Sequence, residues 1–227
     1  RLIMKWSLQV LCTAVSVLSI LIGGCANKED EPATIEEETV SREKPRTIIT
    51  SDGEIDDADS FIRMLLYANE FNIEGLIYSS SQWHYKGDGK GTTFVSEMEM
   101  TREIYGERTE LRWPGTTWMQ ELIGEYAKIE ANLKLHDDAY PSADYLLGLI
   151  RTGNIEFEGE MDKDTEGSDF IRQKLLDSDT SDLYLQAWGG TNTIARALKS
   201  IQEEFGGTDQ WKDVYSRPGI ASLRGIL

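Results

Sequence analysis

The chain has 227 residues, the length of one domain with short appendages, and 40% of them are hydrophobic, which excludes a wholly disordered chain. Its formal net charge is −17, from 40 Asp and Glu against 23 Lys and Arg. This charge argues against nucleic acid as a partner, because phosphate binding needs clustered Lys and Arg, and it favours a neutral or cationic ligand or a metal ion.

The first 25 residues have the pattern of an export signal. The basic Lys5 precedes an apolar run over residues 8–22, and two glycines lead to Cys25. This pattern predicts a lipoprotein signal peptide over residues 1–25, with Cys25 carrying the lipid. A retained membrane helix is the alternative, for which the run is only marginally long. The expected location is the bacterial cell envelope, periplasmic or at the cell surface, with membrane contact only through the lipid.

Both cysteines of the chain lie within this signal segment, so the mature domain has neither a disulfide nor a thiolate metal site. Residues 26–45 are acidic and rich in Pro and Thr, which predicts a disordered tether. The folded domain is expected over residues 46–216.

The domain begins with a strand, a loop and a helix. Residues 47–50 are β-branched and predict a strand, residues 61–68 have apolar spacing typical of a helix, and residues 73–78 predict a second strand. Such a βαβ unit predicts an α/β fold with an open, mostly parallel, Rossmann-like sheet and flanking helices. Further elements follow in chain order: a loop at 82–91, helices at 94–105, 118–135, 142–150 and 168–176 (the last two with serine caps), a strand at 183–187 and a helix at 192–205.

Acidic residues gather where the first strand passes into the helix. Asp52, Glu54, Asp56 and Asp57 would repel one another unless a cation lay among them, and Ca²⁺ takes six to eight oxygen ligands from such groups. Gly53 permits the tight turn between them. Mg²⁺ is the second choice. The alternative is that these residues only cap the helix, since acidic side chains are favoured at helix N-termini.

Residues 50–58 resemble the aspartate signature of nucleoside hydrolases. The resemblance implies that Asp52 binds Ca²⁺ and acts as the base on water, that Asp56 contacts the sugar and that Asp57 is a Ca²⁺ ligand. Glu54 departs from the family's pattern, and its additional carboxylate would bind metal, bind ligand or spoil the site.

Two later segments extend the resemblance. Residues 75–82 end in Gln82, where the family has an asparagine that contacts ribose, and residues 187–195 are similar to the motif whose backbone carbonyl binds Ca²⁺. By position that carbonyl belongs to Trp188. Asn192 is a candidate ligand contact. The alternatives are a loop-capping role for Gln82 and a helix-capping role for Asn192.

Aromatic residues directly follow Gln82. Trp83 would stack on a sugar face, and His84 would protonate a leaving group; the alternative is that the aromatic rings pack on neighbouring loops. With the segments above, this run is similar to the nucleoside-hydrolase-like domain of the DUF1593, cellulose-binding Sde182-type family of secreted bacterial proteins. The similarity covers about residues 45–215.

The last segment, residues 217–227, is expected to be an aberrant tail, because Pro218 would interrupt the next central strand. The resemblance then implies a domain incomplete at its C-terminus and a metal site lacking one carboxylate. The predicted function is Ca²⁺-dependent hydrolysis of an N-glycosidic or related glycosidic bond in a sugar-containing small molecule or polysaccharide. The alternative is a non-catalytic carbohydrate-binding protein at the cell surface. No oligomeric state is predicted.

Overall fold

The computed structural model describes residues 44–179 and 181–216. The predicted signal peptide with Cys25, the tether up to residue 43 and the predicted tail lie outside the described residues. Within them, every pairing of the main sheet is parallel, as predicted. The sheet has the order β5-β2-β1-β6, formed by Ile150–Thr152, Asn72–Tyr78, Arg46–Ser51 and Leu183–Ala187. A small antiparallel pair joins β3 and β4, which are Phe94–Val95 and Glu107–Arg108.

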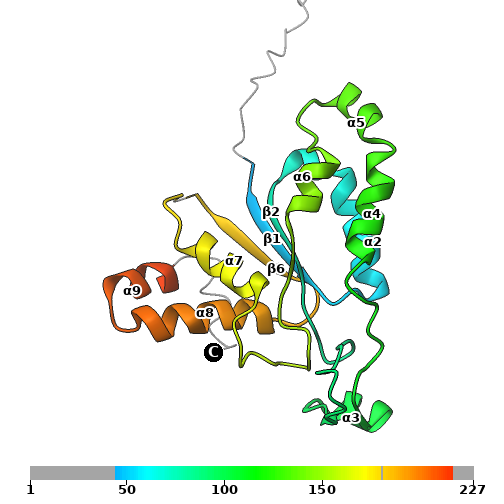
Figure 1. Cartoon of the computed structure of the whole chain (residues 1–227). Coiled ribbons are helices and arrows are strands. Elements are labelled where there is room, and N and C mark those ends of the chain that lie inside the picture. The colour runs from blue at the N-terminus through cyan, green and yellow to red at the C-terminus, as the bar shows by residue number, and fades with distance from the viewer. Residues whose placement is uncertain (1–43, 180, 217–227) are drawn as a thin grey trace, which may run out of the picture. The chain divides into compact units, whose positions relative to one another are not determined.

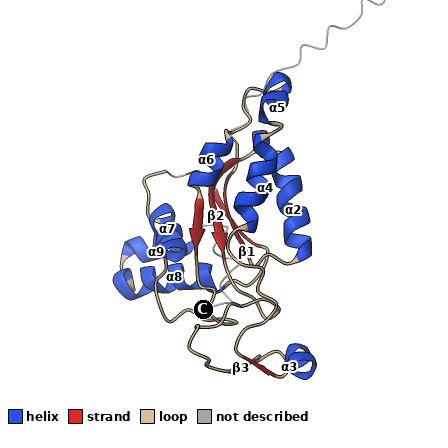
Figure 2. Ribbon diagram, turned by 45° about the vertical axis from the view of Figure 1, so that its right-hand side comes forward, coloured by secondary structure: helices blue, strands red, loops and turns tan. Residues whose placement is uncertain are grey.

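Helices cover both faces of the sheet (Figure 1). One layer contains α2, α4 and α6, which are Ile55–Leu66, Trp118–Ala127 and Ala143–Gly148, with the short η1 at Ala68–Glu70. The other layer contains α7, α8 and α9, which are Glu166–Leu175, Asn192–Phe205 and Asp209–Ser216. Two short helices, α5 at Glu130–His136 and α3 at Glu99–Tyr105, project beyond opposite ends of the sheet (Figure 2).

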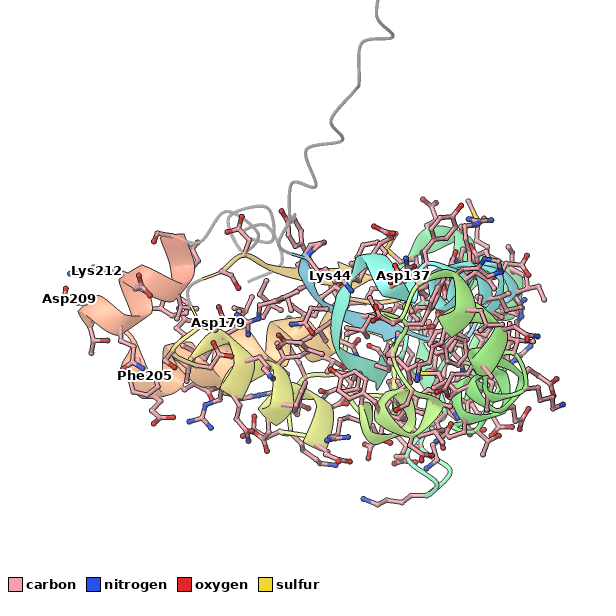
Figure 3. The ribbon with its side chains drawn as sticks, turned by 90° about the horizontal axis from the view of Figure 1, so that it is seen from above. Lys44, Asp137, Asp179, Phe205, Asp209 and Lys212 are labelled. Atoms are coloured by element: carbon pink, nitrogen blue, oxygen red, sulfur yellow. The ribbon has the colours of Figure 1, made fainter. Side chains whose placement is uncertain are left out.

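The alternation of side chains along the strands builds a core on each face. In β1, Ile49 joins the cluster beneath α2 and α4, while its neighbour Ile48 joins the cluster beneath α7 and α8. In β2, Leu76 joins the cluster beneath α2 and α4, and Ile77 joins the cluster beneath α7 and α8. Successive strand residues point to opposite faces, so the centres of β1 and β2, which are buried on both faces, carry consecutive apolar residues. Figure 3, viewed from above, shows the strands between the two helical layers, with Phe205, Asp209 and Lys212 at the far end of the α8 and α9 layer.

The sequence prediction was wrong about several boundaries. The helix expected at 118–135 is two helices, because the amides of Lys128 and Ile129 bond three residues back and tighten the chain into a turn. The helix expected at 94–105 begins only at Glu99, since Phe94 and Val95 pair with β4.

The cap of α7 also differs from the prediction. Thr165, three residues before the predicted Ser168, is the N-cap, and the two form a reciprocal capping box. The serine cap of α6 is confirmed, since Ser142 accepts the amide of Tyr145. The short strand β5 and the helix α9 were not predicted.

A charged cluster closes the amino-terminal end of the sheet. Arg46 is 3% exposed, and its guanidinium contacts Glu74 at 2.6 Å and Asp177 at 2.7 Å. Lys174 adds a second cation 2.9 Å from Glu74. These pairs fix the start of β1 against β2 and α7. Of the helices in the described part of the chain, none combines the length and apolar character needed to cross a bilayer.

The carboxyl ends of the strands are joined by backbone hydrogen bonds. Ser79 donates to the carbonyl of Ser51, Trp188 to that of Thr50, and Gly190 to that of Ser80. The loops that follow β1, β2 and β6 are therefore held beside one another. In open parallel sheets this edge is where ligands bind.

Candidate metal and sugar site

A cleft of about 580 Å³ opens at this edge of the sheet. Its walls come from the loops after β1, β2 and β6, from the segment that leads into α3, and from the loop between β5 and α7. The lining residues are Asp52, Glu54, Ser81, Gln82, Trp83, Met98, Glu158, Gly159, Met161, Trp188, Gly189, Gly190, Thr191, Asn192 and Ala195. Six residues predicted for the site therefore line one cavity.

Asp52 is the most buried carboxylate of the cleft wall, at 2% exposure. Its Oδ1 accepts the amide of Glu54 at 3.2 Å, and its Oδ2 lies 3.4 Å from Nδ1 of His84. Burial works against the charged form, but the interactions with His84 and Ser81 outweigh it and lower the pKa of Asp52. Asp52 is therefore an ionised carboxylate at neutral pH.

Asp57 is also buried, but it faces the turn and does not line the cleft. Its Oδ2 accepts the hydroxyl of Ser51 at 2.5 Å and the amides of Asp52 at 3.2 Å and Gly53 at 3.4 Å. Burial raises the pKa of Asp57 to about 6. These contacts hold the chain reversal after β1, and a metal-binding role for Asp57 stays a prediction.

Glu54 and Asp56 take opposite positions around this turn. Glu54 lines the cleft, is half-buried and lies 3.9 Å from the guanidinium of Arg112. Asp56 is exposed in the first turn of α2, outside the cleft lining, and its Oδ1 accepts the amide of Asp57 at 3.1 Å. The structure thus brings Glu54 to the cleft and places Asp56 in a position typical of helix N-termini.

The turn itself depends on Gly53. This residue has φ of 77°, and a Cβ there would lie 2.5 Å from Nε1 of Trp118 and 2.6 Å from Pro114. Both the left-handed backbone and the lack of space require glycine. The indole of Trp118 packs edge to face on Phe61 and Tyr78, so the turn packs against the core beneath α4.

Gln82 and Trp83 lie on the cleft wall after β2. The side-chain carbonyl of Gln82 accepts the hydroxyl of Thr101 at 3.0 Å, and the indole of Trp83 packs edge to face on Tyr105 with ring centroids 6.3 Å apart. Both contacts tie this wall to α3. The predicted roles of Gln82 and Trp83 in sugar binding stay predictions.

His84 lies behind Asp52, and it does not line the cleft. It is 4% exposed, and its Nδ1 has no hydrogen-bond partner among the described residues. Its 3.4 Å contact with Oδ2 of Asp52 favours the ionised carboxylate by proximity but does not have the geometry of a hydrogen bond. A direct proton transfer from His84 to a leaving group stays a prediction.

The loop after β6 forms the opposite wall. Trp188 donates its indole N–H to Gln186 at 3.2 Å and lines the cleft. Gly189 packs directly on Asp52, since a Cβ at residue 189 would lie 2.8 Å from Cγ of Asp52. The glycine is therefore required for the approach of the two loops. Ca²⁺ binding by the carbonyl of Trp188 stays a prediction.

Asn192 lines the cleft, yet its side chain is engaged in the protein. Its Nδ2 donates to Ser80 Oγ and the Asn154 carbonyl at 2.9 Å and to the Glu160 carbonyl at 3.1 Å, and its Oδ1 accepts the hydroxyl of Ser79. No side-chain hydrogen bond caps α8, so the capping alternative is wrong. Asn192 ties three loops together at the floor of the cleft.

Three side chains could hold a metal ion together. Asp52, Glu54 and His84 each offer one ligand atom, and these atoms lie within 4.8 Å of one another. Two members, Asp52 and Glu54, were predicted as a metal ligand and as an additional carboxylate, while His84 was predicted as an acid. The fit to Ca²⁺ is incomplete for this set, because it supplies two carboxylates and a nitrogen where Ca²⁺ prefers oxygens.

Glu158 was missed by the sequence prediction. It lines the cleft from the loop between β5 and α7, and its Oε2 is buried without a hydrogen-bond partner among the described residues. In this loop Ile155, Phe157 and Met161 alternate with the glutamates at 156, 158 and 160, and no motif separates Glu158 from the other two. No sequence signal therefore distinguished Glu158 from the other acidic residues of the chain.

Comparisons with known proteins agree with this architecture. The chain matches the family model described as cellulose-binding Sde182, nucleoside hydrolase-like domain, over residues 46–222. It also resembles the solved structure of a nucleoside hydrolase-related hypothetical protein from Saccharophagus degradans that is associated with carbohydrate metabolism. The TM-score is 0.61 at 23% identity, over 77% of this chain and 37% of that chain. The chain thus spans little more than a third of that structure's length. A search of curated proteins finds no match.

Proposed function

The chain belongs to the family of the cellulose-binding Sde182, nucleoside hydrolase-like domain, and from this premise we propose that its cleft binds a sugar-containing ligand and hydrolyses a glycosyl bond with the help of a divalent cation. The ligand class is a nucleoside-like small molecule or an oligosaccharide. Asp52 is the proposed base.

The observation that supports this function best is that Asp52 is both buried and ionised. It is nearly fully buried, yet its pKa is lowered, and it lies on the wall of a cleft large enough for a sugar. A carboxylate that stays ionised in such a place can accept a proton from water and can bind a cation. The neighbouring amide of Glu54 and the packing of Gly189 fix its orientation.

The cleft wall supplies groups that suit a sugar. Trp83 and Trp188 are the aromatic residues that line the cavity, and Gln82 and Glu54 bring hydrogen-bonding groups. Aromatic faces stack on the apolar faces of sugar rings, while amides and carboxylates bond to hydroxyls.

The family resemblance implies Ca²⁺ as the cation, with Mg²⁺ as the second choice, and Asp52, Asp57 and the Trp188 carbonyl as its ligands. When bound, such a cation makes water more acidic and stabilises negative charge. The chain's own part is to hold the carboxylate of Asp52 rigidly and to exclude bulk water from it through burial.

A substrate panel tests the proposal. Purified protein is incubated with nucleosides and β-linked oligosaccharides in the presence of divalent cations, and release of reducing sugar is measured. We expect release from at least one class, and we expect chelation with EDTA to abolish it. Absence of release from every member, together with binding of one, would reject hydrolysis.

Sugar binding without hydrolysis is the second candidate. Two observations favour it: Asp56, the family's sugar contact, lies outside the cleft lining, and His84 does not reach the cleft wall as a proton donor. The family's description as cellulose-binding agrees with it. Sedimentation with insoluble cellulose, and displacement by soluble cello-oligosaccharides, would detect this activity.

We also propose that the protein is exported and lipid-anchored at Cys25 in the cell envelope. The basic residue, the apolar run and the glycines before Cys25 support this proposal. Growth with a radioactive fatty acid should label the wild-type protein, and a Cys25→Ser variant should remain unlabelled. Labelling of that variant would reject the assignment.

A further inference from the structure

We propose that Asp52, Glu54 and His84 bind a divalent transition-metal ion of the zinc class, and that this ion is preferred to Ca²⁺. The inference names the metal of the site described above. A role of this ion in catalysis rests on the proposed function. The binding of the ion does not, and it is tested without substrate.

The three residues meet because two neighbouring strands end side by side. Asp52 and Glu54 follow β1, His84 follows β2, and the two strands pair in parallel up to Ser51 and Tyr78. Their ligand atoms lie within 4.8 Å of one another. One cation can therefore contact all three with small movements of the side chains.

The orphaned nitrogen of His84 is the independent observation. Buried polar atoms almost always have a hydrogen-bond partner, but Nδ1 of His84 has none among the described residues and faces Oδ2 of Asp52 at 3.4 Å. At 4% exposure the ring is shielded from bulk solvent. A cation between the imidazole and the carboxylates would satisfy this nitrogen and offset two negative charges.

The backbone around His84 keeps the ring in this position. The hydroxyl oxygen of Ser81 accepts the amides of Trp83 at 2.9 Å and His84 at 3.3 Å, and the His84 carbonyl accepts the amide of Ser81 at 2.9 Å. The loop after β2 is thus a closed turn. Ligands held by such turns are preorganised, which lowers the entropy lost on metal binding.

The donor set decides the class of metal. Imidazole is a ligand for Zn²⁺ and its transition-metal neighbours, whereas Ca²⁺ requires six to eight oxygens. Catalytic zinc sites use three protein ligands, drawn from His, carboxylate and Cys side chains, and leave the fourth position to water or substrate. Asp52 and Glu54 line the cleft, so an ion that they and His84 held would be accessible to a ligand in the cleft.

Calorimetry on the metal-stripped full-length chain tests the preference. Zn²⁺, Mn²⁺ and Ca²⁺ are titrated separately, without substrate. We expect one Zn²⁺ per chain and an affinity at least about tenfold above that for Ca²⁺. The His84→Ala variant should lose at least about tenfold in Zn²⁺ affinity, and the matched His136→Ala variant, changed at the exposed end of α5, should lose none.

A second measurement avoids any dependence on the folding of variants. The chain has two histidines, so the ¹⁵N spectrum of histidine-labelled wild-type protein contains two imidazoles. Addition of Zn²⁺ should shift the nitrogen signals of His84 and leave those of His136 in place. Tighter binding of Ca²⁺ than Zn²⁺, or an unchanged His84 signal on saturation with Zn²⁺, would overturn the proposal. Zinc binding without sugar release would instead reject only the proposed hydrolysis.

Discussion

Nδ1 of His84 lies 3.4 Å from Oδ2 of Asp52, and both side chains are almost completely buried at the carboxyl edge of the sheet. The contact joins the ends of β1 and β2, so the base proposed for hydrolysis is supported by a residue from the neighbouring strand. The pair gives Asp52 an environment unlike that of the exposed acids Asp56 and Asp59 on the helix α2 that follows it.

Substitution of Asp52 is the most direct test of this environment. Asp52→Asn keeps the size of the side chain but removes the proposed base, so we expect hydrolysis to fall by about 10² to 10⁴. Reducing-sugar release measures the effect. Asp59→Asn, at an exposed position of α2, is the matched control and should retain full activity. Equal activity of the two variants would exclude Asp52 as the base.

Trp83 on the cleft wall gives a prediction about ligand binding. Trp83→Ala removes the indole beside Gln82 and should weaken binding of the sugar ligand by about tenfold, equivalent to about 1.4 kcal/mol. Calorimetry with the tightest ligand of the panel measures this loss. Tyr184→Ala, 51% exposed on β6, removes a comparable ring away from the cleft lining and should leave the affinity unchanged. A similar loss in both variants would contradict the assignment.

Much of the fold could be predicted from the sequence because its signals are local. The strand before Asp52 and the helix after it follow from β-branched residues and from apolar spacing, and the parallel sheet follows from the βαβ order. The break between α4 and α5 could not be found in this way. Apolar side chains keep a helical spacing across Lys128 and Ile129, so the period does not report the turn.

The site was predictable where neighbours in sequence form it, and less so elsewhere. Asp56 and Asp57 are adjacent on α2, and adjacent helix residues point in different directions, so one is exposed while the other is buried. The sequence does not say which. The approach of His84 to Asp52 depends on the register of β1 with β2, a tertiary relationship that no local pattern contains.

Two glycines with different surroundings give the next prediction. A Cβ at Gly189 would lie 2.8 Å from Cγ and 2.9 Å from the amide nitrogen of Asp52, so Gly189→Ala must displace the proposed base. We expect destabilisation by about 1–3 kcal/mol, as for overpacked positions, and a loss of hydrolysis of more than about tenfold. Urea unfolding and sugar release measure the two effects.

The matched control is a glycine inside a helix. Gly124 lies in α4 with no heavy atom within 4 Å of an added Cβ. Gly124→Ala should stabilise the domain by up to about 1 kcal/mol, because alanine favours the helix, and should leave hydrolysis unchanged. Normal activity in Gly189→Ala would contradict the prediction. It would show that the loops after β1 and β6 tolerate a wider separation.

The last prediction concerns acid sensitivity at the opposite end of the sheet. Burial disfavours the charged form of Glu74, but hydrogen bonds from Arg46 and Lys174 outweigh it and lower the pKa of Glu74 below its ordinary value of 4.5. A carboxyl whose pKa is lower in the folded state contributes stability above pH 4.5, and this contribution is lost as the pH falls through the folded pKa.

Glu74→Gln should therefore unfold more easily at neutral pH, by about 3 kcal/mol, since it leaves Arg46 with only part of its buried ion pairing. The free energy of unfolding of the variant should also vary less with pH than that of the wild type between about pH 5 and 3. Urea titrations across this range measure both effects, with the exposed Glu103→Gln as the control. Parallel pH profiles for Glu74→Gln and the wild type would show that another group carries the acid sensitivity. Stability depends on pH only through groups whose pKa differs between the folded and unfolded states.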